Sequence, residues 1–252
     1  MTQLLRRARQ TGKALLRRFG FIIHRWPGTR FDAMEDALQL LRLSGFQPDV
    51  VLDIGANHGQ WARKAYRIFP EATFHLVEPQ AGCAESLRAL AASTPNIHYH
   101  PFVMTRPGVS SVTMAGGGEN QDSGGNFIPV PGEVVSNIKT YPATSVDVHF
   151  ASMPGNRILL KLDVEGHELI VLEGAPATLQ RVEVIVAEFW AYPIWGKDMT
   201  TLTGLVNWMH DAGFDLYDFA ALVARRRDNR LRGGDVIFVR RGSPLLADVS
   251  WD

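Results

Sequence analysis

The 252-residue chain is short of cysteine, net charge and long apolar runs. Its single cysteine, Cys83, excludes an intramolecular disulfide and is typical of a reducing compartment. Because the formal net charge is zero, the whole molecule gains no attraction to nucleic acid, and we expect no nucleic-acid partner. No stretch approaches the roughly 20 apolar residues that a membrane-spanning helix needs. We therefore predict a cytoplasmic protein.

Acidic residues are missing from the start of the chain, where no Asp or Glu precedes Asp32. Arginine and lysine are frequent there, and apolar residues recur at roughly helical spacing over residues 2–19. No apolar core or cleavage site of a signal peptide follows. We predict a basic N-terminal helical segment over residues 1–45. Its basic face is either solvated or contacts anionic lipid or a lipid-linked acceptor.

Strand-like and helix-like patterns alternate through the rest of the chain. Strands are expected at residues 49–54, 73–77, 97–103, 157–162, 182–187, 214–217 and 235–239. Helices are expected at residues 32–43, with Asp32 as the N-cap, and at 61–69, 81–92, 167–180 and 200–212. Strands separated by helices of about ten residues predict an α/β fold, a doubly wound and mostly parallel sheet with helices on both faces.

Two glycine-rich segments are expected to lie outside regular structure. Residues 115–126, AGGGENQDSGGN, have the composition of a loop. Gly233 and Gly234 are interpreted as a flexible lead into the last strand. We see no linker that divides residues 46–252, which are expected to form one domain.

A glycine turn follows the first strand of the alternating pattern, in the sequence GANHG at residues 55–59. In a doubly wound sheet such a turn lies at the carboxyl edge, where ligands bind. Gly55 and Gly59 let the backbone approach a ligand closely, and Asn57 lies between them. The spacing G-x-x-x-G differs from the G-x-G-x-x-G of dinucleotide-binding proteins, so a pyrophosphate site is not expected.

Acids stand at the ends of the first two strands. Glu78 follows the second strand, where a carboxylate accepts hydrogen bonds from ribose hydroxyls. Asp53 precedes the glycine turn, where an acid favours a cationic group such as a sulfonium. Together the two acids predict a positively charged nucleoside as ligand. The alternative is that both acids only cap turns or helices.

Three segments resemble the FkbM family of class I S-adenosylmethionine-dependent methyltransferases: VLDIGANHGQW at residues 51–61, VEP at 77–79 and LLKLDVEGHELIVLEGA at 159–175. The resemblance covers about residues 51–239. It implies a Rossmann-like, seven-stranded sheet with an antiparallel last strand, and a catalytic domain over residues 46–252. The cofactor, S-adenosylmethionine, is expected at a set of residues near the carboxyl edge: Asp53, Gly55, Asn57, Gly59 and Glu78. Residues 102–105, FVMT, lack the acid or amide often found beside the adenine, so apolar packing is expected there.

The resemblance also implies methyl transfer to a hydroxyl of a sugar, a glycolipid or a secondary metabolite. Methylation of an alcohol needs a positioned acceptor and a base. Asp163 and Glu188 end predicted neighbouring strands, and Glu165 follows in the loop, so these three are predicted to be catalytic. Asp163 is the first choice for the base, while Glu165 either faces the acceptor or bonds loop amides.

Other residues of this segment receive structural predictions. Glu168 is expected to be a charge at the start of a helix, where it suits the helix dipole. Lys161 is expected to be a salt-bridge partner. Neighbouring carboxylates repel one another, so either one acid has a raised pKa or a Mg²⁺-like ion bridges Asp163 and Glu188. We favour the first.

Two other functions remain open from the sequence. An N-methyltransferase of a small molecule or peptide would need no strong base, and a module could bind S-adenosylmethionine without turnover. The acceptor side is predicted to include residues 189–195, FWAYPIW, with residues 116–126 as a lid. The arginines of residues 225–232 are either a solvated turn or contacts for a phosphorylated or lipid-linked acceptor.

Overall fold

A computed structural model describes residues 29–115, 138–194 and 199–250 of the chain. Three predictions lie wholly or partly outside these residues: the basic helix at 2–19, the lid at 116–126 and the last aromatic residue of the segment 189–195. They stay predictions.

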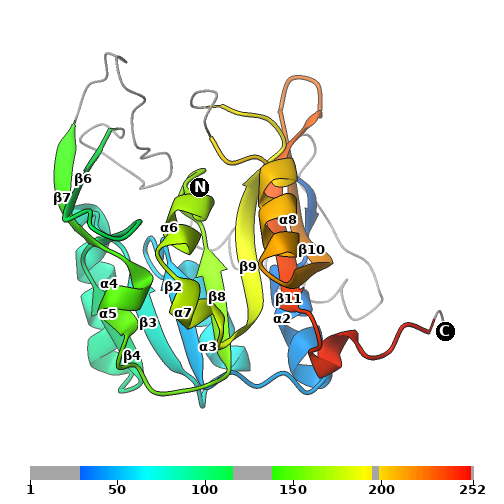
Figure 1. Cartoon of the computed structure of the whole chain (residues 1–252). Coiled ribbons are helices and arrows are strands. Elements are labelled where there is room, and N and C mark those ends of the chain that lie inside the picture. Colours follow the sequence, from blue (N-terminus) through cyan, green and yellow to red (C-terminus); the bar gives the residue numbers. More distant parts are fainter. Residues whose placement is uncertain (1–28, 116–137, 195–198, 251–252) are drawn as a thin grey trace, which may run out of the picture.

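The described residues form one large sheet covered by helices and one small sheet (Figure 1). The strands are β1 (Thr29–Asp32), β2 (Val50–Ile54), β3 (Thr73–Val77), β4 (Ile97–His100), β5 (Val103–Met104), β6 (Ser111–Met114), β7 (Lys139–Thr144), β8 (Ile158–Leu162), β9 (Val182–Trp190), β10 (Phe214–Ala224) and β11 (Leu231–Arg240). The helices are α2 (Met34–Leu43), α3 (Gln60–Ile68), α4 (Ala81–Ser93), α5 (Val146–Phe150), α6 (Glu168–Glu173), α7 (Pro176–Leu179) and α8 (Leu202–Asp211), with the 3-10 helix η1 (Pro244–Leu246).

The large sheet has the strand order β1-β10-β11-β9-β8-β2-β3-β4. Its central pairs, from β9 through β8 and β2 to β3 and β4, are parallel. The last strand, β11, runs antiparallel between β9 and β10. The predicted doubly wound α/β sheet with an antiparallel last strand is confirmed. It gains an eighth strand because β1 pairs with the edge of β10.

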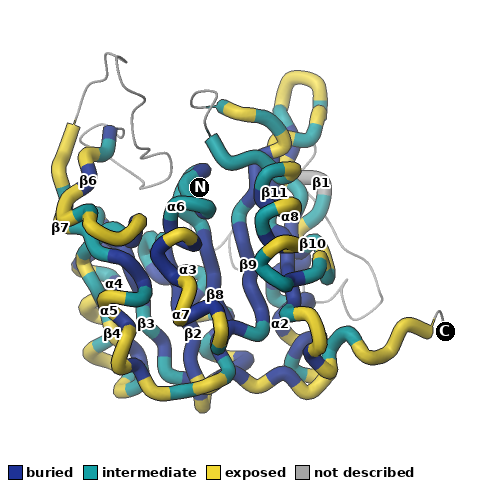
Figure 2. Tube along the Cα trace, in the orientation of Figure 1, coloured by how far each residue is buried: buried dark blue, intermediate teal, exposed yellow. Residues whose placement is uncertain are grey.

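Apolar layers cover both faces of this sheet (Figure 2). Leu52 and Leu160 pack with α5 to α8, whereas Val51 and Leu159 pack on the opposite face with α2 to α4. Every residue of β2 and β8 is buried. Strands buried on both faces read as continuous apolar runs, and this explains why the sequence pattern located them.

Several elements differ from the predictions in length or continuity. Asp32 is not the N-cap of α2, because its backbone pairs with Ala221 of β10 and Ala33 takes the cap position. The strand predicted at 97–103 divides into β4 and β5, of which β5 joins the small sheet. The helix predicted at 167–180 divides into α6 and α7, since Pro176 has no N–H to continue a helix.

The glycines Gly233 and Gly234 lie inside β11 rather than in a flexible lead. A Cβ atom on Gly234 would overlap the carbonyl oxygen of Ala221 on β10, and one on Gly233 would overlap that of Phe189 on β9. The two glycines therefore allow β11 to fit closely between its neighbours.

Residues 29–45 pack against the rest of the described chain. Leu38 and Leu41 of α2 are fully buried in the same apolar cluster as Val51 of β2. A separate basic segment therefore stays a prediction for residues 1–28 only. None of the described helices is long and apolar enough to cross a membrane.

Candidate active site

The glycine turn after β2 packs directly against the chain that follows β8. Gly55 has φ +82°, and a Cβ atom there would overlap the carbonyl oxygen of Asp163. The Asp163 amide donates to the Ile54 carbonyl at 3.0 Å, which ties the two strand ends together. Asn57 also has a positive φ, 49°, a conformation that asparagine tolerates better than most residues. Gly59, with φ +77°, is the N-cap of α3.

Glu78 follows β3 and is held by backbone amides. Its side chain is 3% exposed, and its two oxygens accept hydrogen bonds from the amides of Asn57 and Gln80, each at 3.0 Å. Burial raises the pKa of Glu78, and these two hydrogen bonds act in the opposite direction. A carboxylate has about four acceptor positions, so Glu78 keeps the capacity to accept further bonds from a ligand.

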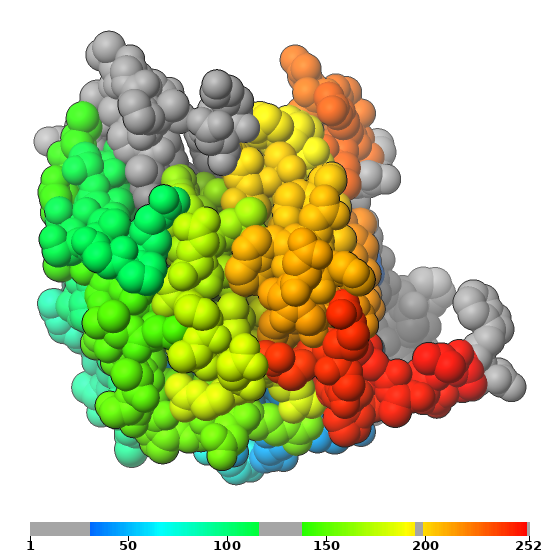
Figure 3. All heavy atoms as spheres, viewed as in Figure 1, coloured from blue at the N-terminus to red at the C-terminus, as the bar shows by residue number. Residues whose placement is uncertain are grey.

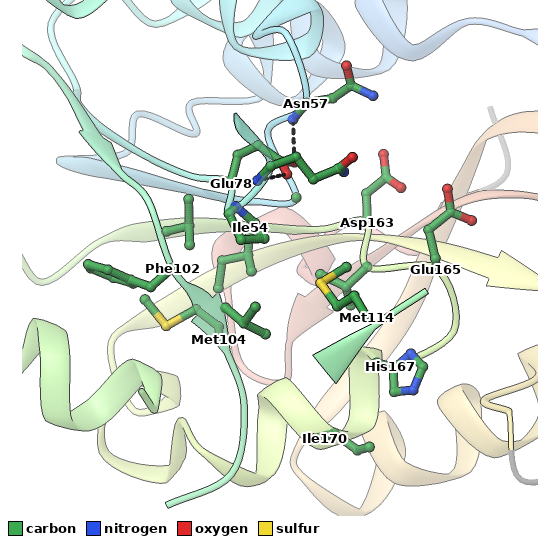
Figure 4. A pocket seen from close by; sticks show the side chains of 16 residues that line it. Ile54, Asn57, Glu78, Phe102, Met104, Met114, Asp163, Glu165, His167 and Ile170 are labelled. Carbon is green, nitrogen blue, oxygen red and sulfur yellow. Dashed lines mark hydrogen bonds between the residues drawn. The ribbon is translucent and has the colours of Figure 1, made fainter. Parts of the chain in front are cut away.

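A pocket of about 760 Å³ of empty space, partly open to solvent, lies at the carboxyl ends of β2, β3 and β8. Figure 4 shows Asp163 and Glu165 on one side of the pocket and Phe102 and Met104 on the other. Phe102 and Met104, which belong to the segment where apolar packing is predicted, thus line the pocket. Of the predicted cofactor residues, Gly55, Asn57 and Glu78 line this pocket, whereas Asp53 and Gly59 do not.

Asp53 lies beneath the pocket and is paired with a buried lysine. Lys161 Nζ is 3.0 Å from Asp53 Oδ1, 3.3 Å from Asp163 Oδ2 and 2.6 Å from the Gly55 carbonyl oxygen. Burial raises the pKa of Asp53, and Lys161 opposes this effect. Burial alone would lower the pKa of Lys161, but the charges of Asp163 and Asp53 raise it above its usual value. Lys161 is the salt-bridge partner that we predicted, and its ammonium group is a cation beside Asp53.

The loop between β8 and α6 presents Asp163 and Glu165 to the pocket. The side chain of Asp163 is 40% exposed, and Glu165 has a positive φ of 55°. Glu168, at the start of α6, is fully buried and accepts the Val164 amide at 3.3 Å and the Gly166 amide at 3.2 Å. Glu168 therefore bonds loop amides, the role that we considered for Glu165. Burial, opposed by the amide bonds and increased by the charge of Asp163, raises the pKa of Glu168 to about 8.

A second acid pair lies behind the pocket, one strand beyond β8. Glu188 was predicted to end its strand, and this prediction is wrong because β9 continues to Trp190. Its Cα partner on β11 is Asp235, and the two side chains share one face of the sheet. Burial is the largest influence on both; it raises the pKa of Asp235 to about 7 and, with the charge of Asp163, that of Glu188 well above its usual value. Neither side chain lines the pocket.

Asp235 was missed in the sequence analysis. The available signal was an acid at the start of the apolar run VIFV at residues 236–239, directly after two glycines. The pairing with Glu188 follows only from the insertion of β11 beside β9.

In the described ranges no group of three or more His, Cys, Asp or Glu side chains is placed to hold a metal ion. The ion bridging Asp163 and Glu188, which was the alternative from the sequence, gains no support and stays a prediction. We derive no step through a metal.

A family comparison now identifies the chain. The Methyltransferase FkbM domain matches residues 53–216, which is more than half of the chain and includes the ends of β2, β3 and β8 at the pocket. The chain belongs to the FkbM methyltransferase family. By its description, this family is one of methyltransferases.

One curated relative of this FkbM protein is the hexuronic acid methyltransferase AglP of Haloferax volcanii. The two chains are 28% identical over 180 residues, which cover 67% of this chain and 66% of AglP. The match therefore spans just under two thirds of the relative.

Solved structures of other methyltransferases show a more distant likeness. An O-methyltransferase family protein from Burkholderia thailandensis has a TM-score of 0.47 and 10% identity, covering 83% of this chain and 56% of that one. The 1,6-didemethyltoxoflavin-N1-methyltransferase of the same organism has a TM-score of 0.45 and 11% identity, covering 83% and 78%. Because both TM-scores are below 0.5, neither likeness carries an argument on the acceptor.

Proposed function

We propose that this FkbM methyltransferase methylates a hydroxyl group of a sugar, either free or as part of a glycolipid or secondary metabolite. The observation that carries the proposal is the position of Asp163, a partly exposed carboxylate in the pocket wall beside the glycine turn. The similarity to a hexuronic acid methyltransferase supports a sugar as the acceptor.

The pocket fits S-adenosylmethionine, whose sulfonium supplies an electrophilic methyl group. Only glycine fits at position 55, so the backbone of the turn can approach a ligand closely. Glu78 can still accept hydrogen bonds from the two ribose hydroxyls. The backbone amide of Asn57 holds the Glu78 carboxylate by donating a hydrogen bond to it. Phe102 and Met104 provide an apolar surface for the adenine. Gly59 contributes indirectly, by starting α3.

Asp163 is proposed to accept the proton of the acceptor hydroxyl as the oxygen of that hydroxyl takes the methyl group. A general base of this kind contributes roughly 10²–10⁴-fold to the rate. Lys161 fixes the position of Asp163, because its ammonium group is held at the same time by Asp53 on the neighbouring strand. Asp53 is thus a positioning residue.

The remaining acids are proposed to control charge around this base. Glu165 lines the same side of the pocket and faces the acceptor. Glu188 and Asp235 have raised pKa values, which favours their uncharged forms and limits the negative charge near Asp163. Glu188 therefore acts through its charge state and not by contact with the acceptor.

The proposal is tested by incubating the protein with S-adenosylmethionine carrying a ¹³C-labelled methyl group and a panel of sugars, uronic acids and amines. The carbon chemical shift of the product distinguishes an O-methyl from an N-methyl group. We expect an O-methylated sugar. An N-methylated product would instead support the N-methyltransferase alternative, and the absence of S-adenosylmethionine binding in calorimetry would exclude an enzyme altogether.

A further inference from the structure

The turn between β10 and β11 carries an unusual concentration of positive charge. Residues 225–232, named the arginine hairpin, contain five arginines and a single acid, Asp228. The arginines are Arg225, Arg226, Arg227, Arg230 and Arg232.

The single acid neutralises only part of this charge. Asp228 forms an ion pair with Arg225 and lies 3.7 Å from Arg227 Nε, and its Oδ1 also accepts the Arg230 amide at 3.1 Å. These contacts fix the turn. Within the part of the chain that the structure describes, Arg226, Arg230 and Arg232 form no salt bridge. Their charges remain available to a ligand.

Aromatic rings at the end of β9 hold three of the guanidinium groups. The Arg230 guanidinium lies 4.5 Å from the ring centroid of Tyr192, and that of Arg225 lies 5.7 Å from the same centroid. Arg232 lies 5.2 Å from the Trp190 ring centroid. A guanidinium stacked on a ring keeps its N–H edge open for a carboxylate or phosphate, so the stacking preorganises the arginines for such a group.

The arginine hairpin begins close to the acids behind the pocket. Trp190 is two residues beyond Glu188 on β9, and Arg232 is three residues from Asp235 on β11. At about 3.3 Å per residue, the arginines start roughly 10 Å from this acid pair. Figures 1 and 3 show the hairpin projecting beyond the end of β9, at the edge of the sheet where the pocket lies.

We propose that the arginine hairpin, together with Tyr192, binds an anionic group of the acceptor, the carboxylate or phosphate of an acidic sugar. The inference rests on the proposed function and adds the charge of the substrate. Asp163 and Glu165 repel an anion from the pocket, whereas the arginines attract it. The acceptor is thereby oriented with its anionic group on the arginine hairpin and a hydroxyl toward Asp163. An arginine can bind a carboxylate or a phosphate through two parallel hydrogen bonds, which fixes this orientation.

The proposal is tested with the full chain, saturated with S-adenosylhomocysteine, on an array of neutral hexose glycans, glucuronic acid glycans and mannose 6-phosphate glycans. We expect the acidic glycans to be retained over the neutral ones. The double substitution Arg230→Gln and Arg232→Gln should reduce that preference roughly tenfold or more, since hydrogen bonds between charged groups are lost. Arg88→Gln, on the exposed surface of α4, removes an arginine elsewhere and should leave the preference unchanged.

A second pair of variants tests the stacking. Tyr192→Phe keeps the ring and should retain the preference, whereas Tyr192→Leu removes the ring and should reduce it. The ratio of glucuronic acid to mannose 6-phosphate retention tells whether the anionic group is a carboxylate or a phosphate.

On the array, the proposal would be overturned by equal retention of neutral and acidic glycans, by no retention of any glycan, or by a preference that survives in the double variant. Binding to phosphatidylglycerol vesicles without a preference for acidic glycans would also overturn it, in favour of a membrane contact. Calorimetry with S-adenosylhomocysteine separates the two proposals. Normal binding with no glycan preference contradicts only the arginine hairpin, whereas absent binding contradicts the proposed function itself.

Discussion

Glu168 gives a quantitative test of how burial controls the acids of this site. The side chain is fully buried, and only its Oε1 accepts hydrogen bonds, from the amides of Val164 and Gly166. Its Oε2 has no hydrogen-bond partner among the described residues. We consider the substitution Glu168→Gln, which preserves the shape and the accepting oxygen but cannot ionise.

The expected effect depends on pH in a definite direction. The pKa of Glu168 is about 8 in the folded protein and near its ordinary value of 4.5 in the unfolded chain. The folded state therefore binds the proton more tightly, and the wild-type free energy of unfolding falls as the pH rises from about 5 to 8. A difference of about 3.5 pKa units at 1.36 kcal/mol each sets an upper limit of about 5 kcal/mol. The glutamine variant does not pay this cost of ionisation.

The assay is urea unfolding of both proteins at several values between pH 5 and pH 9. The stability of Glu168→Gln relative to wild type should be about 1 kcal/mol at pH 5 and rise to about 3 kcal/mol by pH 7. Glu173→Gln is the control, because Glu173 lies in the same helix but is half exposed and pairs with Arg106 as its one salt bridge among the described residues. We expect its stability to change by less than about 1 kcal/mol at any pH. A relative stability of Glu168→Gln that is constant or falls with rising pH would refute the reasoning.

Three further substitutions test other parts of the site. Glu78→Gln should weaken S-adenosylmethionine binding roughly tenfold to a hundredfold in calorimetry, because hydrogen bonds to a charged acceptor contribute about 1.5–3 kcal/mol; an unchanged Kd would show that Glu78 does not contact the cofactor. Gly55→Ala places a Cβ atom against the Asp163 carbonyl oxygen at a residue with φ +82°. The free energy of unfolding should fall by about 1–3 kcal/mol, and cofactor binding should be lost. Unaltered urea unfolding and unaltered binding would contradict the close approach of the Gly55 backbone to Asp163. Lys161→Met leaves Asp53 as an unpaired buried acid and should lower the free energy of unfolding by about 3–5 kcal/mol. A decrease below about 1 kcal/mol in urea unfolding would show that the ion pair is not required for stability.

The central part of the fold was predictable because its strands are buried on both faces. β2 and β8 are buried throughout and apolar except for Asp53 and Lys161, and they are followed by turns with glycine or acids, so both their positions and the carboxyl edge could be located. The same property located Asp163 and Glu78 at strand ends. Short or exposed strands give no such pattern, and this explains why β1, β6 and β7 were missed.

The contacts between acids were less predictable because they depend on strand order and register. Asp53 meets Lys161 only because β2 and β8 are parallel neighbours with these residues as Cα partners. Glu188 meets Asp235 only because the last strand inserts beside β9. Local sequence carries neither piece of information. For Glu168, the helix-start position was visible, but its burial follows from the packing of the whole loop.

The central claim is that Asp163 acts as the base for methyl transfer to a hydroxyl, and the turnover of Asp163→Asn tests it most directly. The measurement is kcat with an acceptor identified in the sugar panel, at saturating S-adenosylmethionine, with the Kd of the cofactor determined in parallel. The account predicts that kcat falls by roughly 10²–10⁴-fold while the Kd changes only a few-fold. A variant that keeps kcat within about tenfold of wild type would contradict it.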